Sequence, residues 1–99
     1  MKQEIHQFAL VVKEYDEAIK FYSEVLKFDL LEDTPISDVK RWVRIRPKGS
    51  EGTGILLARA KNERESNRIG DQTGGRVFLF LYTDDIDRDH RNLINHNVK

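Results

Sequence analysis

Residues 7–28 read QFALVVKEYDEAIKFYSEVLKF, an apolar run followed by a helical repeat. The run over residues 8–12 is apolar and bounded by polar residues, which is typical of a β-strand covered on both faces, and we place that strand over residues 4–13. The apolar residues that follow share one face of a helix at i, i+3, i+4, i+7 and i+8. They are Ala18, Phe21, Tyr22, Val25 and Leu26. The sequence therefore predicts a strand followed by an amphipathic helix.

Three further strands are expected after this helix, over residues 28–32, 40–46 and 54–60. Residues 40–46 alternate in character, which is the period of a strand with two different faces. One face carries Arg41, Val43 and Ile45, and the other carries Trp42, Arg44 and Arg46. A turn cluster rich in proline and glycine over residues 47–52 separates the last two strands.

The remaining chain repeats the opening pattern. Residues 61–75 contain Ile69 as their one apolar side chain and are expected to form a connecting loop. Residues 76–83 are expected to form a fifth strand, and Thr83 to Asp85 to cap a second helix. Superimposing Gln7 on Phe78 aligns strand with strand and helix with helix. We therefore expect an α+β fold in which residues 1–60 form a βαβββ module, residues 61–75 a loop, and residues 76–99 an incomplete second module (βα) that lacks roughly 30 residues of strands.

Composition limits the classes of partner. The chain carries 17 basic and 17 acidic residues and no cysteine. A balanced charge offers no excess of cations for a nucleic-acid backbone, and the lack of cysteine excludes disulfides and thiolate metal sites. The apolar runs are far shorter than the roughly 20 residues that cross a membrane. We expect a cytoplasmic protein that binds neither nucleic acid nor membrane.

The opening motif resembles that of the vicinal oxygen chelate superfamily, which includes glyoxalase I, bleomycin resistance proteins and extradiol dioxygenases. The residues that carry the resemblance are Gln7, Glu14, Phe21-Tyr22 and Val25-Leu26, with Lys27 where glycine is usual. The resemblance implies a glyoxalase-like fold of two βαβββ modules, whose curved mixed sheets enclose a cavity with the helices outside.

The resemblance also implies where a divalent metal would be held, by side chains of the first and fourth strands of each module. Gln7 occupies the first of these positions and is the one ligand-capable residue among them. Phe78 occupies the equivalent position of the second module, and residues 54–60 contain no Glu, Gln or His. The last position would follow Lys99. We therefore expect no metal site of the usual kind, and a divalent metal only if other residues supply ligands.

Two sets of side chains are candidates for binding a small molecule in the cavity. Phe78, Phe80 and Tyr82 share the face expected to be concave, where they form either core or an aromatic wall. Trp42, Arg44 and Arg46 form either a site for an anionic or aromatic ligand, or a solvated face or subunit contact. Gln7 is expected to join them, and His6 to point the opposite way, toward the helices. The predicted ligand-binding set is Gln7, Trp42, Arg44, Phe78, Phe80 and Tyr82.

Three functions remain open from the sequence. The first is a small-molecule binding or processing protein without the usual metal. The second is a metal-dependent lyase, isomerase or dioxygenase, which would take its missing ligands from another segment or subunit. The third is a degenerate structural or interaction module. An unpaired sheet edge and a half-open cavity favour association with another chain, so we also expect a homodimer. Exchange of structural elements between the two copies is one form that this dimer can take.

Overall fold

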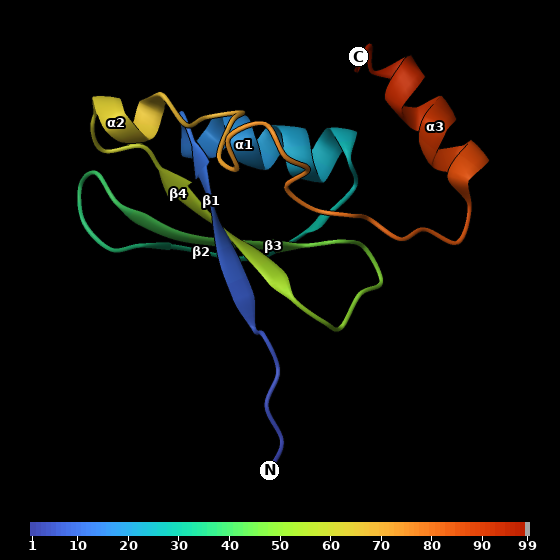
Figure 1. The fold of residues 1–99 in the computed structure, drawn as a ribbon, viewed down its shortest axis with the longest axis horizontal. Coiled ribbons are helices and arrows are strands. Elements are labelled where there is room, and N and C mark those ends of the chain that lie inside the picture. The colour runs from blue at the N-terminus through green and yellow to red at the C-terminus, as the bar shows by residue number, and fades with distance from the viewer. Residues whose placement is uncertain (99) are drawn as a thin grey trace.

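The computed structural model describes residues 1–98 and confirms the α+β class (Figure 1). One curved sheet contains four strands: β1 (Gln7–Val12), β2 (Asp29–Pro35), β3 (Arg41–Arg46) and β4 (Gly54–Arg59). Their order across the sheet is β1-β4-β3-β2, with β1 parallel to β4 and the other neighbours antiparallel. The four strands predicted for the first module are therefore formed.

A single helical segment covers one face of the sheet (Figure 1). It begins as α1 (Tyr15–Lys20) and continues as the π-helical η1 (Phe21–Val25), in which the N–H of Leu26 donates to the carbonyl of Phe21, five residues earlier, at 3.1 Å. Lys27 ends it with a φ of 63°, in the left-handed region. Ala18, Tyr22 and Leu26 of the predicted apolar stripe face the core. Phe21 was predicted to join them but is 38% exposed, because the wider π-helical turn that begins there changes the angular spacing of the side chains.

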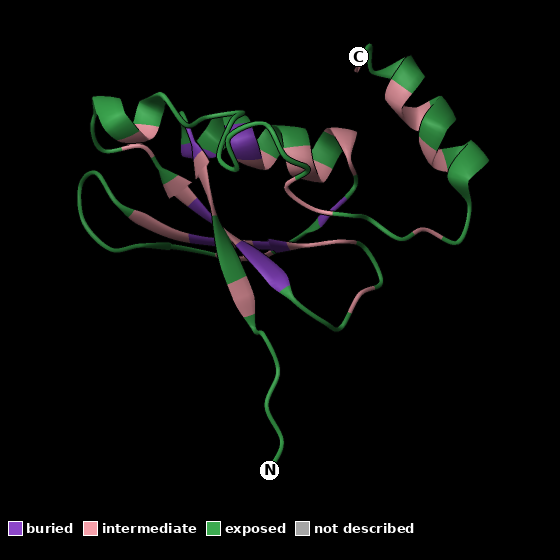
Figure 2. Cartoon of the chain, viewed as in Figure 1, coloured by how far each residue is buried: buried purple, intermediate pink, exposed green. Residues whose placement is uncertain are grey.

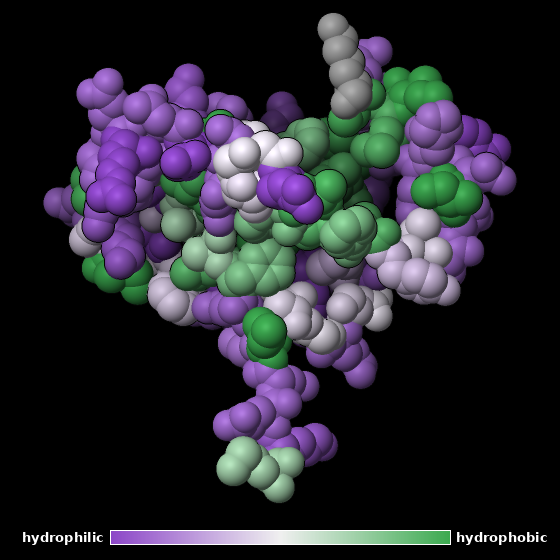
Figure 3. Space-filling model, viewed as in Figure 1, coloured by the Kyte–Doolittle hydropathy of each residue, from purple (hydrophilic) through white to green (hydrophobic). Residues whose placement is uncertain are grey.

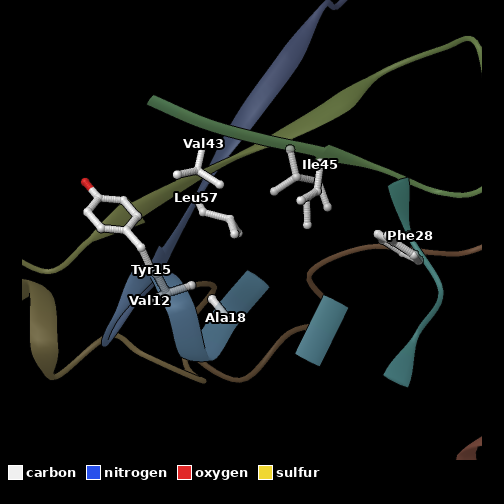
Figure 4. Packing of buried hydrophobic residues seen from close by; sticks show 8 residues of the cluster. Val12, Tyr15, Ala18, Phe28, Val43, Ile45 and Leu57 are labelled. Atoms are coloured by element: carbon white, nitrogen blue, oxygen red, sulfur yellow. The ribbon is translucent and has the colours of Figure 1, made fainter. Parts of the chain in front are cut away.

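The hydrophobic core lies between this helical segment and the sheet (Figure 4). Val43, Ile45 and Leu57 are fully buried, and come from the two central strands. Burying one such side chain stabilises the fold by about 1.5–3 kcal/mol. The face of β3 predicted to be apolar is therefore the face that meets the helix. Figure 2 shows buried residues on the sheet and on the helix that covers it.

Residues 61–98 pack more loosely than the sheet and the helical segment that covers it. A short helix, α2 (Glu63–Ser66), lies within the predicted loop, and α3 (Ile86–Asn95) follows near the C-terminus. As predicted, an acidic residue caps α3, because the Asp85 side chain accepts from the N–H of Arg88 at 3.0 Å. α3 contains no buried residue and is attached to η1 by Asn92, whose side-chain amide donates to the carbonyl of Val25 at 2.6 Å. No helix within residues 1–98 is long and apolar enough to cross a membrane.

The strand predicted over residues 76–83 is not formed. This segment runs outside the sheet toward α3, and four of its apolar side chains are exposed: Val77, Phe80, Leu81 and Tyr82. Figure 3 shows the resulting apolar surface between the body of the molecule and α3. A β-prone segment becomes a strand only where another strand pairs with its backbone, and among the described residues none lies beside it.

Candidate functional site

The face of the sheet turned away from the helix carries the polar half of the β3 alternation. We call it the open face. Trp42, Arg44 and Arg46 lie on it, opposite the buried Val43 and Ile45, which confirms the predicted division of this strand. Alternation and register place two residues of β1 and two residues of its neighbour β4 on the same face. These are Gln7 and Ala9 of β1 across from Gly54 and Leu56 of β4.

Arg44 connects three elements across this face. Its Nε donates to Oε1 of Gln7 at 2.7 Å, and its Nη2 lies 2.9 Å from Nε2 of His6. Its Nη1 lies 3.7 Å from Oε1 of Glu32 on β2, where the register between β2 and β3 shifts at a bulge. The Arg44 side chain retains 20% of its exposure. The guanidinium is therefore held in place, partly covered, on the open face.

The positions of two neighbours of Arg44, His6 and Glu32, were not predicted from the sequence. His6 was expected to point toward the helices, and this was wrong, because its ring contacts Arg44 as Gln7 does. Residue 6 precedes β1, so strand alternation does not determine its direction. Glu32 was not predicted to lie here, because its side depends on the bulge between Leu30 and Glu32, which the sequence pattern does not reveal.

Gly54 permits the close approach of β4 to β3. It is the register partner of Gln7 and is buried, and a Cβ at this position would lie 3.1 Å from the carbonyl oxygen of Ile45. Continuing the pairing of Ile45 with Ile55 by one residue places Gly54 beside Arg46. A residue without a side chain therefore lies between Gln7 and Arg46 on the open face.

Arg46 is the second cation of the open face. Its Nε is shielded from solvent and has no hydrogen-bond partner within residues 1–98. Asp29 is its cross-strand neighbour. A buried donor without an acceptor is uncommon in folded proteins and points to a group that a water or ligand completes.

Two hollows adjoin the open face at its other end. One, of about 620 Å³, has Ala9, Val11 and Ala58 as its floor and residues of α2 as its wall. The other, of about 600 Å³, is lined by Trp42 and Leu56, by the turn between β2 and β3, and also by Tyr15 and Leu57 from the helix side of the sheet. Ala58, Lys61 and Glu65 line both hollows. Trp42 therefore stands at the edge of a concave surface large enough for a small organic molecule, for which sites of roughly 300–1,000 Å³ are usual.

The wall formed by α2 was missed in the sequence, where residues 61–75 were expected to be a loop. Asn62 accepts from the N–H of Glu65 at 2.9 Å, and Glu65 accepts in return from the N–H of Lys61 at 3.3 Å. The spacing of Asn62 and Glu65 is that of a helix-capping box. This spacing is the signal by which α2 could have been found.

The predicted aromatic wall is not assembled beside these residues. Phe78 packs edge-to-face on Phe8, with ring centroids 5.4 Å apart, and Phe8 lies on the helix side of the sheet. Phe80 and Tyr82 are 90% and 91% exposed. The structure thus brings Gln7, Trp42 and Arg44 to one face and leaves Phe78, Phe80 and Tyr82 apart from them.

The side chains present do not fit the metal centre that the family resemblance implies. Gln7, the one ligand-capable residue at an expected position, has its amide oxygen engaged by the Arg44 cation. The β4 residues facing the same side are Gly54, Leu56 and Ala58, which have no donor atoms in their side chains. In the part of the chain that the structure describes, no three His, Cys, Asp or Glu side chains gather as ligands. The open face therefore lacks a set of side chains that would hold a metal of the usual kind.

Comparison with known proteins agrees with this architecture. A protein of Shewanella frigidimarina (strain NCIMB 400), described as uncharacterized, is 53% identical over 100 residues, which span all of this chain and 74% of that protein. The antibiotic binding protein TnmS3 of Streptomyces sp. CB03234 is 29% identical with a TM-score of 0.72, over 96% of this chain and 71% of TnmS3.

A glyoxalase/bleomycin resistance protein from the same Streptomyces is also 29% identical, with a TM-score of 0.69. The match covers 94% of this chain and 74% of that one. The model of one family matches residues 4–99. The chain belongs to the Glyoxalase/Bleomycin resistance protein/Dioxygenase superfamily.

Proposed function

We propose that this protein binds a small planar organic molecule on the open face, without transforming it. Trp42 supplies a ring for stacking, and Gln7 and Arg44 supply polar groups that orient the ligand. The observation that carries the proposal is the position of Trp42, which lines a hollow of about 600 Å³ two residues along β3 from the fixed guanidinium of Arg44.

Two further observations support binding. TnmS3, which is similar to this chain over 96% of its length, is an antibiotic binding protein. The floor of the hollows consists of small or apolar side chains such as Ala58 and Leu56, while charged residues such as Lys61 stand at the wall. An apolar floor with a few polar groups at its margin is the usual composition of a small-molecule site. The metal-dependent alternative is less well supported, since Gln7 is engaged by Arg44.

Trp42 also provides the test, because it is the single tryptophan of the chain. Its indole N–H gives one resonance in a ¹H–¹⁵N spectrum, which reports on the open face alone. We expect naphthalene, quinoline or acridine derivatives to shift this resonance in a saturable manner and to be recovered unchanged. A Trp42→Ala variant should bind these compounds at least about tenfold more weakly, as expected for loss of a stacked ring.

Tyr82→Ala is the matched control, since Tyr82 is equally aromatic but is 91% exposed and belongs to a segment outside the sheet. Equal weakening by the two substitutions would mean that the aromatic wall forms only with ligand bound. If no compound moved the Trp42 resonance, the proposal would fail and a structural or interaction module would remain. Conversion of the compounds would instead indicate an enzyme.

We propose in addition that the chain associates with a second copy through the apolar segment 77–82. Phe80 and Tyr82 are almost fully exposed, and the segment contains no charged residue. The net charge of the chain is zero at pH 7, so little electrostatic repulsion opposes the approach of two copies. Exposed apolar segments of strand-like sequence favour pairing with another chain.

A further inference from the structure

We propose that the ligand is an aromatic carboxylate, and that Arg44 binds its anionic group as a fixed cation at the position where the family resemblance places a metal ligand. This inference rests on the proposed function and adds the charge of the ligand to it. The observation behind it is that the first expected metal-ligand residue, Gln7, accepts a hydrogen bond from a guanidinium.

The hydrogen bonds of Arg44 position its charge without neutralising it. Gln7 is an uncharged acceptor, and His6 also accepts through a neutral ring nitrogen, because a guanidinium has only donors. A guanidinium has five N–H groups, so three remain after these two bonds. The nearest carboxylate is Glu32, at 3.7 Å and with its side chain 39% exposed. This distance is beyond hydrogen-bonding reach, and the other oxygen of Glu32 accepts from the Thr34 hydroxyl at 3.1 Å, so Glu32 leaves the remaining N–H groups of Arg44 open to another anion.

Arg46 adds a second cation to the same face. Its unpartnered, shielded Nε lies on the same side of β3, two residues from Arg44. Asp29 lies across from Arg46 on β2 and is exposed. Because the N–H of Arg46 has no acceptor within residues 1–98, an anionic oxygen of a ligand or a water that it orders would complete this group.

The spacing of the residues on β3 specifies the shape of the ligand. Trp42 and Arg44 lie two residues apart on one face of the strand, which is roughly 7 Å. A fused two-ring system is about as long as this spacing of the two strand positions, so a carboxylate on a ring system stacked on Trp42 can be directed along the open face toward the Arg44 side chain. A guanidinium matches a carboxylate through two parallel hydrogen bonds, which a neutral amide does not reproduce.

A pair of probes separates charge from ring stacking. 2-Naphthoate and 2-naphthamide share the same rings and differ in the charge of one group. We expect calorimetry to show that the native protein binds the carboxylate about tenfold more tightly than the amide, the usual scale for a charge-assisted hydrogen bond. The preference should disappear in an Arg44→Gln variant, persist in part in Arg44→Lys, and remain complete in Arg91→Gln, a control on the exposed side of α3. Addition of EDTA should leave it unchanged.

The native protein gives a second readout that needs no variant. Titration with 2-naphthoate should shift the Arg44 Nε–H resonance together with the Trp42 indole resonance, whereas 2-naphthamide should shift only the indole. Equal affinity for the two probes, a preference that survives Arg44→Gln, or a preference abolished by EDTA would each overturn the inference. With equal affinity and a shifted indole, the proposed function would still stand. If neither probe shifted the Trp42 indole resonance at a concentration of ~1 mM, the Kd would be weaker than about 1 mM, and both proposals would be wrong.

Discussion

The side chain of Gln72 pairs with the backbone of Val11 as a neighbouring strand would. Oε1 of Gln72 accepts from the N–H of Val11 at 2.8 Å, and its Nε2 donates to the carbonyl of Ala9 at 2.8 Å. β1 is an edge strand, and these two groups point away from β4. One side-chain amide therefore covers part of an edge that would otherwise be open to pairing with another chain.

Replacing Gln72 by alanine should expose this edge. We expect the Val11 amide to exchange with solvent faster, and the free energy of unfolding to fall by about 1 kcal/mol, because two hydrogen bonds at an exposed site are lost. Hydrogen exchange followed by NMR and urea unfolding measure the two effects. A Gln3→Ala variant, altered at an exposed residue before β1, should change neither. An unchanged exchange rate at Val11 would show that Gln72 does not protect the edge in solution.

Lys27 ends the long helical segment at a conformational cost. Its φ of 63° permits the N–H of Phe28 to donate to the carbonyl of Tyr22 at 2.8 Å, an arrangement that usually has glycine at this position. Substitution Lys27→Gly should raise the free energy of unfolding by about 0.5–1 kcal/mol, since a side chain is disfavoured in the left-handed region.

The matched control for that substitution is Lys20→Gly, at the end of α1, where the backbone is right-handed. There glycine should lower the free energy of unfolding by about 1 kcal/mol, as is usual within helices. Urea unfolding of both variants gives the comparison. Destabilisation by both changes would mean that the left-handed turn at Lys27 is not the conformation in solution.

A charged cluster joins the helix to the sheet and makes stability depend on acid. Arg41 donates to Asp16 at 2.8 Å and to Asp33 through two nitrogens, at 3.0 and 2.5 Å. The hydrogen bond from Arg41 lowers the pKa of Asp33, and the two carboxylates raise the pKa of Arg41. Arg41 therefore remains charged, and Asp33 is the group of this pair that titrates.

Because the pKa of Asp33 is lower in the folded state, its ionised form stabilises the fold above the unfolded pKa of about 3.9, and this contribution is lost as pH falls through the folded pKa. We expect Asp33→Asn to reduce the free energy of unfolding at pH 7 by about 0.5–1 kcal/mol, the range for a partly exposed pair. The difference from the native protein should shrink as pH is lowered below about 4. Urea unfolding at several pH values measures this difference in the free energy of unfolding. The control is Asp38→Asn, because Asp38 is exposed. A difference independent of pH would contradict the role of ionised Asp33.

The sequence predicted those features that depend on local pattern. The alternation through residues 41–46 placed Val43 in the core and Arg44 on the opposite face, because side-chain direction in a strand follows position alone. The contact of Arg44 with Gln7 was beyond such reasoning. It joins residues of β3 and β1 across an intervening strand, and depends on the register that β4 sets between them.

In the segment 76–83, the local sequence pattern predicted a strand that the structure does not form. Its alternating aromatic residues predict a strand, but Phe80 and Tyr82 are exposed and outside the sheet. Strand propensity describes how well side chains fit a pleated surface, and the strand itself depends on a partner elsewhere. The predicted wall of Phe78, Phe80 and Tyr82 depended on that pairing, so its assembly could not follow from the pattern of this segment.

Self-association tests whether a second copy covers this segment. We expect light scattering during gel filtration at ~50 µM, a concentration at which micromolar affinities are visible, to give twice the chain mass of 11.6 kDa. A Phe80→Ser/Tyr82→Ser double variant should be monomeric, because it removes the two most exposed aromatic side chains of the segment. Its circular dichroism should match that of the native protein, since neither residue belongs to the core.

The control for association is Ile5→Ser, which removes an apolar side chain that is 73% exposed before β1. If any exposed apolar residue promoted association, this change would weaken the dimer as the double variant does. Because the charge-free stretch 77–82 is the surface proposed to pair, we expect Ile5→Ser to remain dimeric. A monomeric native chain, or a dimer that persists in the double variant, would show that this segment is not an interface between copies.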